Sequence, residues 1–192
     1  ADIPLRANLD VADHNGQSLY MYGYVPSQSA LGVKIVSVYP DNIAKNLTSV
    51  PATMVTLDSE TGQVNSLMDG TYLTRLRTGA ISGAATDELS NPDSKIFALF
   101  GTGGQAETQL EAVLNVRDIK EVRVFDISKD RAEDFAKRMK EKFEADFEFE
   151  IKAVDSADQA IDNADIITAV TTAKDPVFDG TKVKKGCHIN GV

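Results

Sequence analysis

The residues with the clearest chemistry form a glycine-rich turn, GTGGQA, at residues 101–106. The turn follows an apolar run typical of a buried strand and opens a run typical of a helix, as the dinucleotide fingerprint G-x-G-x-x-G/A requires. Gly101 allows the tight turn, Gly103 lets the backbone approach a pyrophosphate, and Ala106 keeps the helix close to the sheet. The predicted cofactor-binding residues of this turn are Gly101, Thr102, Gly103, Gly104, Gln105 and Ala106.

Asp126 supplies the acidic group that this motif needs at the end of the second strand. It follows the fingerprint by about twenty residues, where a carboxylate accepts hydrogen bonds from the hydroxyls of the adenosine ribose. The same carboxylate would repel a 2′-phosphate, and Ile127 and Ser128 add no cation, so NAD is predicted rather than NADP. Lys129 and Arg131 follow closely and weaken that preference. A fold that binds S-adenosylmethionine has a similar strand, turn and helix and stays open as an alternative.

The elements that must position these residues alternate between strand and helix after Pro92. Strands are predicted at residues 94–100, 121–126, 147–154, 164–170 and 187–192, and helices at residues 103–115, 128–143 and 155–162. Strands that alternate with amphipathic helices indicate βαβ units around a parallel sheet. We therefore predict an α/β fold in which residues 91–192 form an NAD-binding Rossmann domain with helices on both faces of the sheet.

Residues 1–90 have a different pattern. Short β-rich runs, separated by turn clusters, predict a mostly antiparallel sheet, and they lie at residues 18–25, 31–40 and 52–58. Residues 68–92 predict one linker helix, capped by Asp69 or Thr71 and ended by Asn91-Pro92. We interpret this part as a substrate-binding and dimerisation domain. Because the sequence has no initiator Met and stops in a strand-like run, we expect both domains to be incomplete.

The composition narrows the classes of partner. The formal net charge is −9 and no basic run is present, which argues against nucleic acid and anionic membranes as partners. Cys187 is the only cysteine, so no intrachain disulfide forms, and with His14 and His188 alone no thiol and histidine metal site is expected. No apolar run approaches the roughly 18 residues of a membrane span, and no signal peptide is recognised, so we expect a cytoplasmic protein.

Several segments in order resemble the ornithine cyclodeaminase and mu-crystallin family: PLR, LGVKIVSVYPDN, MDGTYLTRLRTGAISGAAT, GTGGQAETQLEA and CHIN. The resemblance covers most of the chain. It implies that Arg6, Lys34 and Arg77 bind a substrate carboxylate and place the α-carbon near the nicotinamide, and that Thr78 contacts the cofactor phosphates. It also makes Lys34 the candidate catalytic residue, by proton transfer, since a lysine adds a charge and a transferable proton.

Each of these assignments has a plain structural alternative. Lys34 lies in a strand-like run, where a lysine often faces solvent. Arg77 competes with Arg75, because a helix places the two on different faces, and we interpret Arg77 as the functional one because small residues follow it. Arg6 fits a solvated terminal arginine, and the Thr78 hydroxyl could bond to the preceding helical turn.

The resemblance implies an ornithine cyclodeaminase, a lyase that converts L-ornithine to L-proline and ammonia by NAD-dependent hydride transfer at the α-carbon. Alternatives are an NAD(P)-dependent amino-acid dehydrogenase or ketimine reductase, and a mu-crystallin-like small-molecule binding protein. A methyltransferase would not explain the RTGA helix. The family carries a catalytic aspartate beyond the HIN motif, so within this sequence the acid/base candidates are Lys34 and His188, the latter more typical of a structural residue. The family architecture implies a homodimer that acts on a small amino or imino acid.

Overall fold

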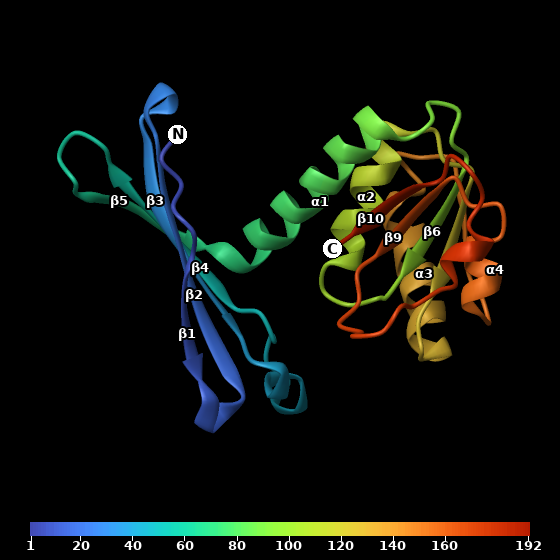
Figure 1. Ribbon diagram of the computed structural model, residues 1–192, viewed down its shortest axis with the longest axis horizontal. Helices are drawn as coiled ribbons and strands as arrows, with labels where there is room; N and C mark the ends of the chain where they lie inside the picture. The colour runs from blue at the N-terminus through green and yellow to red at the C-terminus, as the bar shows by residue number, and fades with distance from the viewer. The chain divides into compact units, whose positions relative to one another are not determined.

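The computed structural model describes residues 1–192 and divides into two compact units, Ala1–Thr74 and Arg75–Val192, which are described separately (Figure 1). The division falls inside helix α1 (Gly70–Leu89) and not at residue 90, where the sequence suggested it. The reason is packing: the Gly79 backbone lies so close to Thr108 that a Cβ on Gly79 would be 2.4 Å from the Thr108 carbonyl oxygen. The roles of the units as substrate and cofactor domains stay predictions.

The first unit is one antiparallel sheet with strand order β1-β2-β3-β4-β5, which confirms the predicted antiparallel part of the fold. Its strands are β1 (Ala7–Val11), β2 (Gly16–Val25), β3 (Ala30–Val38), β4 (Ala52–Asp58) and β5 (Val64–Asp69). Short 3-10 helices connect the first four strands: η1 (Ala12–His14), η2 (Pro26–Gln28) and η3 (Pro40–Lys45). Asn15, Ser29 and Asn46 end these turns with positive φ, a conformation that asparagine tolerates better than most residues.

Asp69 caps the start of α1. The sequence alone leaves both Asp69 and Thr71 as candidates for this cap. Its two carboxylate oxygens accept hydrogen bonds from the backbone N–H groups of Thr71 and Tyr72, each at 3.0 Å. The Thr71 hydroxyl has another task, because it accepts a hydrogen bond from the Ala52 N–H at 3.1 Å. The helix start is therefore tied to β4 by one residue and capped by another.

The apolar core of the first unit is small. Leu19, Val36 and Ala52 are its buried members, and they are neighbours across β2, β3 and β4. Lys34 lies two residues before Val36 and therefore on the same face of β3. The buried apolar core of this sheet is therefore small for its length, which predicts a low stability for the unit by itself.

The second unit is a parallel sheet with strand order β10-β9-β6-β7-β8, which confirms the predicted Rossmann-type architecture. Its strands are β6 (Ile96–Phe100), β7 (Glu121–Phe125), β8 (Glu150–Ala153), β9 (Ile166–Ala169) and β10 (His188–Gly191). The helices between them are α2 (Ala106–Val116), α3 (Lys129–Phe143) and α4 (Ala157–Ile161), with a 3-10 helix, η4 (Gly180–Lys182), before β10. None of the helices combines the length and apolar content needed to span a bilayer.

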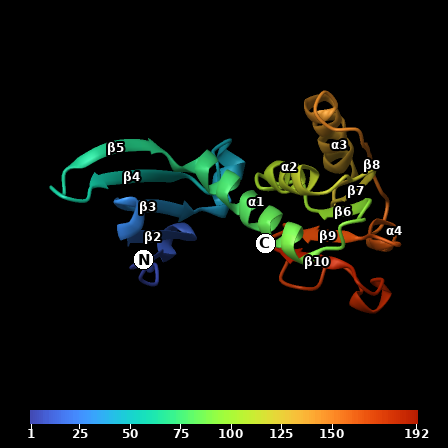
Figure 2. The same ribbon diagram turned by 90° about the horizontal axis from the view of Figure 1, so that it is seen from above.

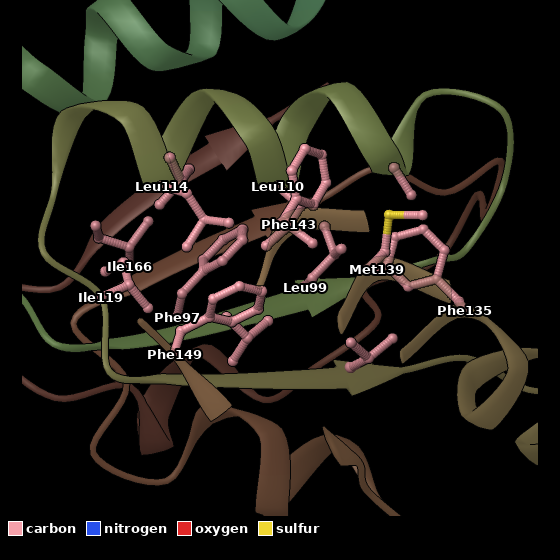
Figure 3. Packing of buried hydrophobic residues seen from close by; sticks show 14 of the residues in the cluster. Phe97, Leu99, Leu110, Leu114, Ile119, Phe135, Met139, Phe143, Phe149 and Ile166 are labelled. Carbon is pink, nitrogen blue, oxygen red and sulfur yellow. The ribbon is translucent and has the colours of Figure 1, made fainter. Parts of the chain in front are cut away.

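Each face of this sheet has its own core. Helices α2 and α3 cover one face of the sheet (Figure 2), and Phe97 and Leu99 belong to the buried cluster on that face (Figure 3). Ala98 and Phe100 point to the opposite face, where α4 contributes Ile161. Burial on both sides explains why β6 reads as a continuous apolar run.

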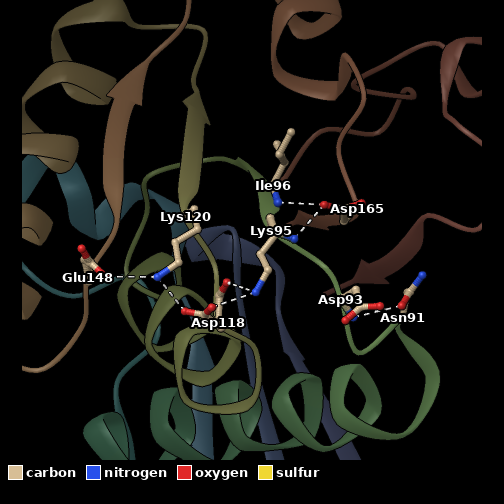
Figure 4. A network of polar contacts seen from close by, with 8 residues as sticks. All are labelled: Asn91, Asp93, Lys95, Ile96, Asp118, Lys120, Glu148 and Asp165. Carbon is tan, nitrogen blue, oxygen red and sulfur yellow. Dashed lines mark hydrogen bonds and ion pairs between the residues drawn. The ribbon is translucent and has the colours of Figure 1, made fainter.

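Paired charges occupy the amino edge of the sheet, where the strands begin (Figure 4). Lys95 and Lys120 share the Asp118 carboxylate, at 2.7 and 2.9 Å, and Lys120 also contacts Glu148 at 3.3 Å. The two lysine hydrogen bonds lower the pKa of Asp118 from its ordinary value. The network joins the starts of β6, β7 and β8.

Asp165 lies at the same edge of the sheet, immediately before β9. Its Oδ2 accepts hydrogen bonds from the N–H groups of Lys95 and Ile96, both at 2.8 Å, and its Oδ1 pairs with Lys184. Burial of Asp165 raises its pKa, but the hydrogen bonds from Lys184 and the two backbone groups outweigh burial, and the pKa is lowered overall. The carboxylate thus satisfies two backbone donors that the start of β6 would otherwise leave open.

Candidate functional site

The glycine-rich turn begins at the carboxyl end of β6, with Gly101 in a conformation that favours glycine. Its φ is 92°, and a Cβ at this position would lie 2.6 Å from the Val170 carbonyl oxygen. The Gly101 N–H donates to the Phe125 carbonyl at 2.9 Å. The turn therefore passes between the ends of β7 and β9, and only a residue without a side chain fits there.

The middle of the turn presents bare backbone. Gly103 is exposed, and a Cβ built on it would have no neighbour within 4 Å. The Ala106 N–H donates to the Gly103 carbonyl at 3.0 Å, so the turn leads directly into α2. Gln105, at the N-cap of α2, provides no side-chain cap. Open backbone beside an uncapped helix N-terminus suits a phosphate, so the geometry fits the pyrophosphate of a dinucleotide.

Asp126 lies immediately after β7 and is held on both of its oxygens. Oδ2 accepts hydrogen bonds from the Thr102 N–H at 3.1 Å and the Thr102 hydroxyl at 2.8 Å. Oδ1 accepts from the Ser128 N–H at 3.0 Å and from Arg131 at 2.6 Å. Burial raises the pKa of Asp126, but these hydrogen bonds lower it by more, so the carboxyl is ionised at neutral pH. The role of Thr102 here is to orient the acid, which its position in the motif did not reveal.

The two cations after Asp126 have different partners. Arg131 forms an ion pair with Asp126, and its side chain is 62% exposed. Lys129 instead pairs with Asp155 at 2.5 Å. Only Arg131 therefore adds positive charge at the predicted ribose site, where it partly offsets the repulsion of a 2′-phosphate by Asp126.

Arg75 lies against the glycine-rich turn, which the sequence analysis missed. Its Nη2, Nε and Cζ atoms are 3.4, 3.5 and 3.6 Å from the position that a Cβ on Gly104 would take. The signal was present in the helix period, because Arg75, Gly79 and Gly83 are spaced by four residues and share the face that packs on α2. Gly79 and Gly83 follow Arg77 in the sequence, but they lie on the helix face that carries Arg75.

The residues assigned to the substrate carboxylate lie in both units. Arg6 precedes β1 and is exposed, whereas Lys34 in β3 is only 8% exposed, unlike the solvent-facing lysine considered as its alternative. Arg77 is exposed and Thr78 half-buried on α1. Because Arg6 and Lys34 belong to one unit and Arg77 and Thr78 to the other, their convergence on one substrate stays a prediction.

His188 takes part in a buried polar network. Its Nε2 lies 3.0 Å from the Asn190 Oδ1, and the Asn190 amide donates to the hydroxyls of Thr86 and Thr168 at 3.0 and 3.3 Å. The network joins β9 and β10 to α1, which agrees with a structural interpretation of His188. Burial raises the pKa of the neighbouring Cys187 thiol to about 11, which makes it a poor nucleophile. No group of three or more His, Cys, Asp and Glu side chains is placed to hold a metal ion.

Comparisons with known proteins agree with this geometry. The chain is 37% identical over 189 residues to a Delta(1)-pyrroline-2-carboxylate reductase of Bacillus cereus, covering 98% of this chain and 57% of the relative. The structure of the Thermococcus litoralis Delta(1)-pyrroline-2-carboxylate reductase in complex with NADH and L-proline is 45% identical, with a TM-score of 0.94 over 100% of this chain and 58% of that one.

A lysine cyclodeaminase structure is 33% identical, with a TM-score of 0.87, and the match covers 99% of this chain and 55% of that one. The chain thus spans less than two thirds of the length of each of these relatives. The model of the ornithine cyclodeaminase/mu-crystallin family matches residues 1–192. The chain belongs to the ornithine cyclodeaminase/mu-crystallin family.

Proposed function

We propose that this chain is the NAD-binding and substrate-binding part of an enzyme that reduces a small cyclic imino acid such as Δ1-pyrroline-2-carboxylate. The observation that carries the proposal is the open backbone at Gly103, beside the uncapped start of α2, in a chain 45% identical to a reductase described with NADH and L-proline. L-proline differs from the imino acid by a hydride at the α-carbon and a proton at the nitrogen. The cofactor supplies the hydride when it is bound.

The chain's own residues have three tasks in this proposal. The turn at residues 101–106 and the start of α2 bind the pyrophosphate, and Asp126 accepts the hydroxyls of the adenosine ribose. Arg6 and Arg77 hold the substrate carboxylate, which fixes the α-carbon next to it. Lys34 donates the proton to the imine nitrogen; its 8% exposure keeps its ammonium largely away from water.

Ornithine cyclodeaminase, which the sequence placed first, is the second candidate. The 33% identity to a structure described for recognition of L-lysine, L-ornithine and L-2,4-diaminobutyric acid favours it. Both reactions move a hydride at an α-carbon next to a carboxylate, so both need residues that bind this carboxylate, the role proposed for Arg6 and Arg77. They differ in redox balance, because the reductase consumes NADH whereas the cyclodeaminase returns the hydride and needs only catalytic NAD.

This difference defines the experiment. The full-length protein is incubated either with Δ1-pyrroline-2-carboxylate and NADH or with L-ornithine and NAD, while proline and NADH absorbance are followed. One NADH oxidised for each proline formed supports the reductase. Proline from ornithine without net NADH change supports the cyclodeaminase, and inactivity in both assays contradicts the proposal.

Lys34→Ala and the control Lys45→Ala sharpen the result. Lys45 is exposed at the end of η3 and lies outside the proposed site. We expect Lys34→Ala to lower kcat by about 100-fold or more, the range of a lost general acid, and Lys45→Ala to leave it unchanged. Equal activities for both variants would remove Lys34 from the mechanism.

We further propose that the enzyme is a cytoplasmic homodimer that pairs through the first unit. Leu9, Tyr22, Val64 and Leu67 of its sheet are exposed apolar side chains, between 46% and 72% accessible. Exposed apolar sheet surface of this kind is commonly covered by a second copy. Light scattering on the full-length protein tests this, and a monomer mass would contradict it.

A further inference from the structure

We propose that Arg75 is a ligand of the cofactor pyrophosphate, reaching it from α1 beside Gly104. The inference rests on the proposed function and adds to it a residue that the family resemblance did not assign. The juxtaposition that supports it is a guanidinium set against Gly104, inside the phosphate-binding turn.

The guanidinium of Arg75 has no acidic partner, a property that within its unit it shares only with Arg77, which is exposed. In the unit Arg75–Val192, each arginine beyond α1 forms an ion pair with a carboxylate: Arg117 with Asp87, Arg123 with Glu121, Arg131 with Asp126 and Arg138 with Asp134. Arg75 is half-buried and pairs with none. A half-buried, unpaired cation in a chain of net charge −9 is free to bind an anion from outside.

The backbone of Arg75 is fixed with respect to the turn. The Thr108 hydroxyl of α2 donates to the Arg75 carbonyl at 3.0 Å, and Gly79, one helical turn later, packs against the Thr108 backbone. The same hydroxyl shares its one hydrogen with the Gln105 carbonyl oxygen, at 3.1 Å. The Thr108 side chain therefore ties the Arg75 backbone to Gln105, the N-cap of α2, so the base of the Arg75 side chain is held beside the turn.

Gly104 makes room for this arrangement. A Cβ at residue 104 would meet the guanidinium at 3.4 to 3.6 Å, an ordinary contact, whereas a branched side chain would extend into the space that the guanidinium occupies. The planar fork of an arginine suits two phosphate oxygens, and the start of α2 contributes its dipole to the same anion. The position of a Cβ on Gly103 is open, and the missing side chain of Gly104 leaves space for the guanidinium.

The test measures binding by the full-length protein without turnover. NADH, ADP-ribose and adenosine are titrated against the wild type, Arg75→Ala, Arg75→Lys and the control Arg138→Ala, whose target is an exposed arginine on α3. We expect Arg75→Ala to lower the affinity for NADH and for ADP-ribose about tenfold or more, and Arg75→Lys to recover part of that affinity. Adenosine has no phosphate, so Arg75→Ala should bind it as tightly as the wild type does. The Arg138→Ala control should bind all three ligands as the wild type does.

Gly104→Val and Gly104→Ala provide a second test that leaves Arg75 in the sequence. We expect Gly104→Val to reproduce the loss of NADH affinity and Gly104→Ala to retain most of it, with melting temperatures confirming that both fold. Unchanged NADH affinity in Arg75→Ala would overturn the proposal. So would an equal loss for adenosine and NADH, because that pattern indicates a displaced turn.

Inorganic pyrophosphate separates this inference from the function on which it rests. If the wild type binds pyrophosphate in an Arg75-dependent way but does not bind NADH, the anion site stands and the dinucleotide function fails. If the wild type binds NADH and Arg75→Ala does so equally well, the function stands and the Arg75 inference fails. Failure of the wild type to bind either molecule overturns both.

Discussion

The two edges of the parallel sheet differ in how completely their polar and charged groups are paired. At the amino edge, Asp118 and Asp165 are each held by lysines or backbone donors, so the charges there satisfy one another. At the carboxyl edge Asp126 is also paired, but Gly103 leaves open backbone and Arg75 leaves an unpaired guanidinium. An edge whose charges are paired contributes to stability, whereas an edge with unused donors is prepared for a ligand.

The strongest test of this contrast is Gly101→Ala, at the carboxyl edge. The methyl group would combine a φ of 92° with a 2.6 Å approach to the Val170 carbonyl. We expect a loss of about 3 kcal/mol in the free energy of unfolding, from conformational strain and overpacking, together with loss of NADH binding. Denaturant unfolding and NADH titration of the full-length protein measure the two effects.

Gly62→Ala is the matched control for that substitution. Gly62 has a φ of 73°, but a Cβ there would have no neighbour within 4 Å. Gly62→Ala should lower the free energy of unfolding by about 1 kcal/mol, through the strain of the left-handed conformation alone, and leave NADH binding intact. If the two variants were equally stable, the contact with Val170 would not restrict residue 101.

Asp165→Asn tests the amino edge. The substitution removes the ion pair with Lys184 and weakens two charge-assisted hydrogen bonds at the start of β6. We expect the free energy of unfolding to fall by about 2 kcal/mol while NADH affinity stays unchanged. The same change at Asp93, whose backbone N–H bonds to Asn91, serves as the control and should have little effect. A loss of NADH affinity in Asp165→Asn would contradict the division of roles between the edges.

Local pattern predicted much of the carboxyl edge. The strand, the glycine spacing and Asp126 all lie within a short stretch of chain, and the structure places Thr102 and Asp126 in direct contact. The rest depends on long-range packing. Arg75 was missed because the small residues after it were attributed to Arg77, although the four-residue spacing from Arg75 to Gly79 places them on the face of Arg75.

The residues proposed to bind the substrate carboxylate show a different limit. The run at residues 31–40 has apolar residues on both faces, so alternation did not reveal that Lys34 would share the buried face with Val36. The sequence also did not determine which cation pairs with Asp126, because Lys129 and Arg131 both follow it. In the structure Arg131 pairs with Asp126, and Lys129 pairs with Asp155. Sequence spacing identifies the candidates, whereas tertiary contacts choose among them.

Gly103→Ala tests the open backbone with a smaller effect. The added methyl meets no protein atom within 4 Å, so we expect the melting temperature to stay unchanged. It would occupy space beside the proposed pyrophosphate, and we expect NADH affinity to fall about tenfold, or 1.4 kcal/mol. Titration of NADH into the full-length variant measures this. Wild-type affinity would mean that the pyrophosphate does not pass over Gly103.

The smallest expected effect is that of Glu121→Gln, at the start of β7. Arg123 and then Lys152 hydrogen-bond to Glu121 and lower its pKa from 4.5 to about 2. A carboxylate with a lowered pKa stabilises the fold above its unfolded pKa, and that contribution is lost as the pH falls from 4.5 towards 2. The side chain is 28% exposed, so we expect the substitution to cost about 1 kcal/mol at pH 7.

The pH dependence distinguishes this ion pair from simple packing. Between pH 7 and pH 5 the wild type should exceed Glu121→Gln in unfolding free energy by a constant amount, and the difference should shrink as the pH falls through 4.5 towards 2. Glu148→Gln is the control, because Glu148 contacts Lys120 at 3.3 Å with its side chain 96% exposed and should contribute nothing measurable. A difference for Glu121→Gln that persisted unchanged to pH 2 would assign the effect to packing and would remove Glu121 from the paired charges of the amino edge.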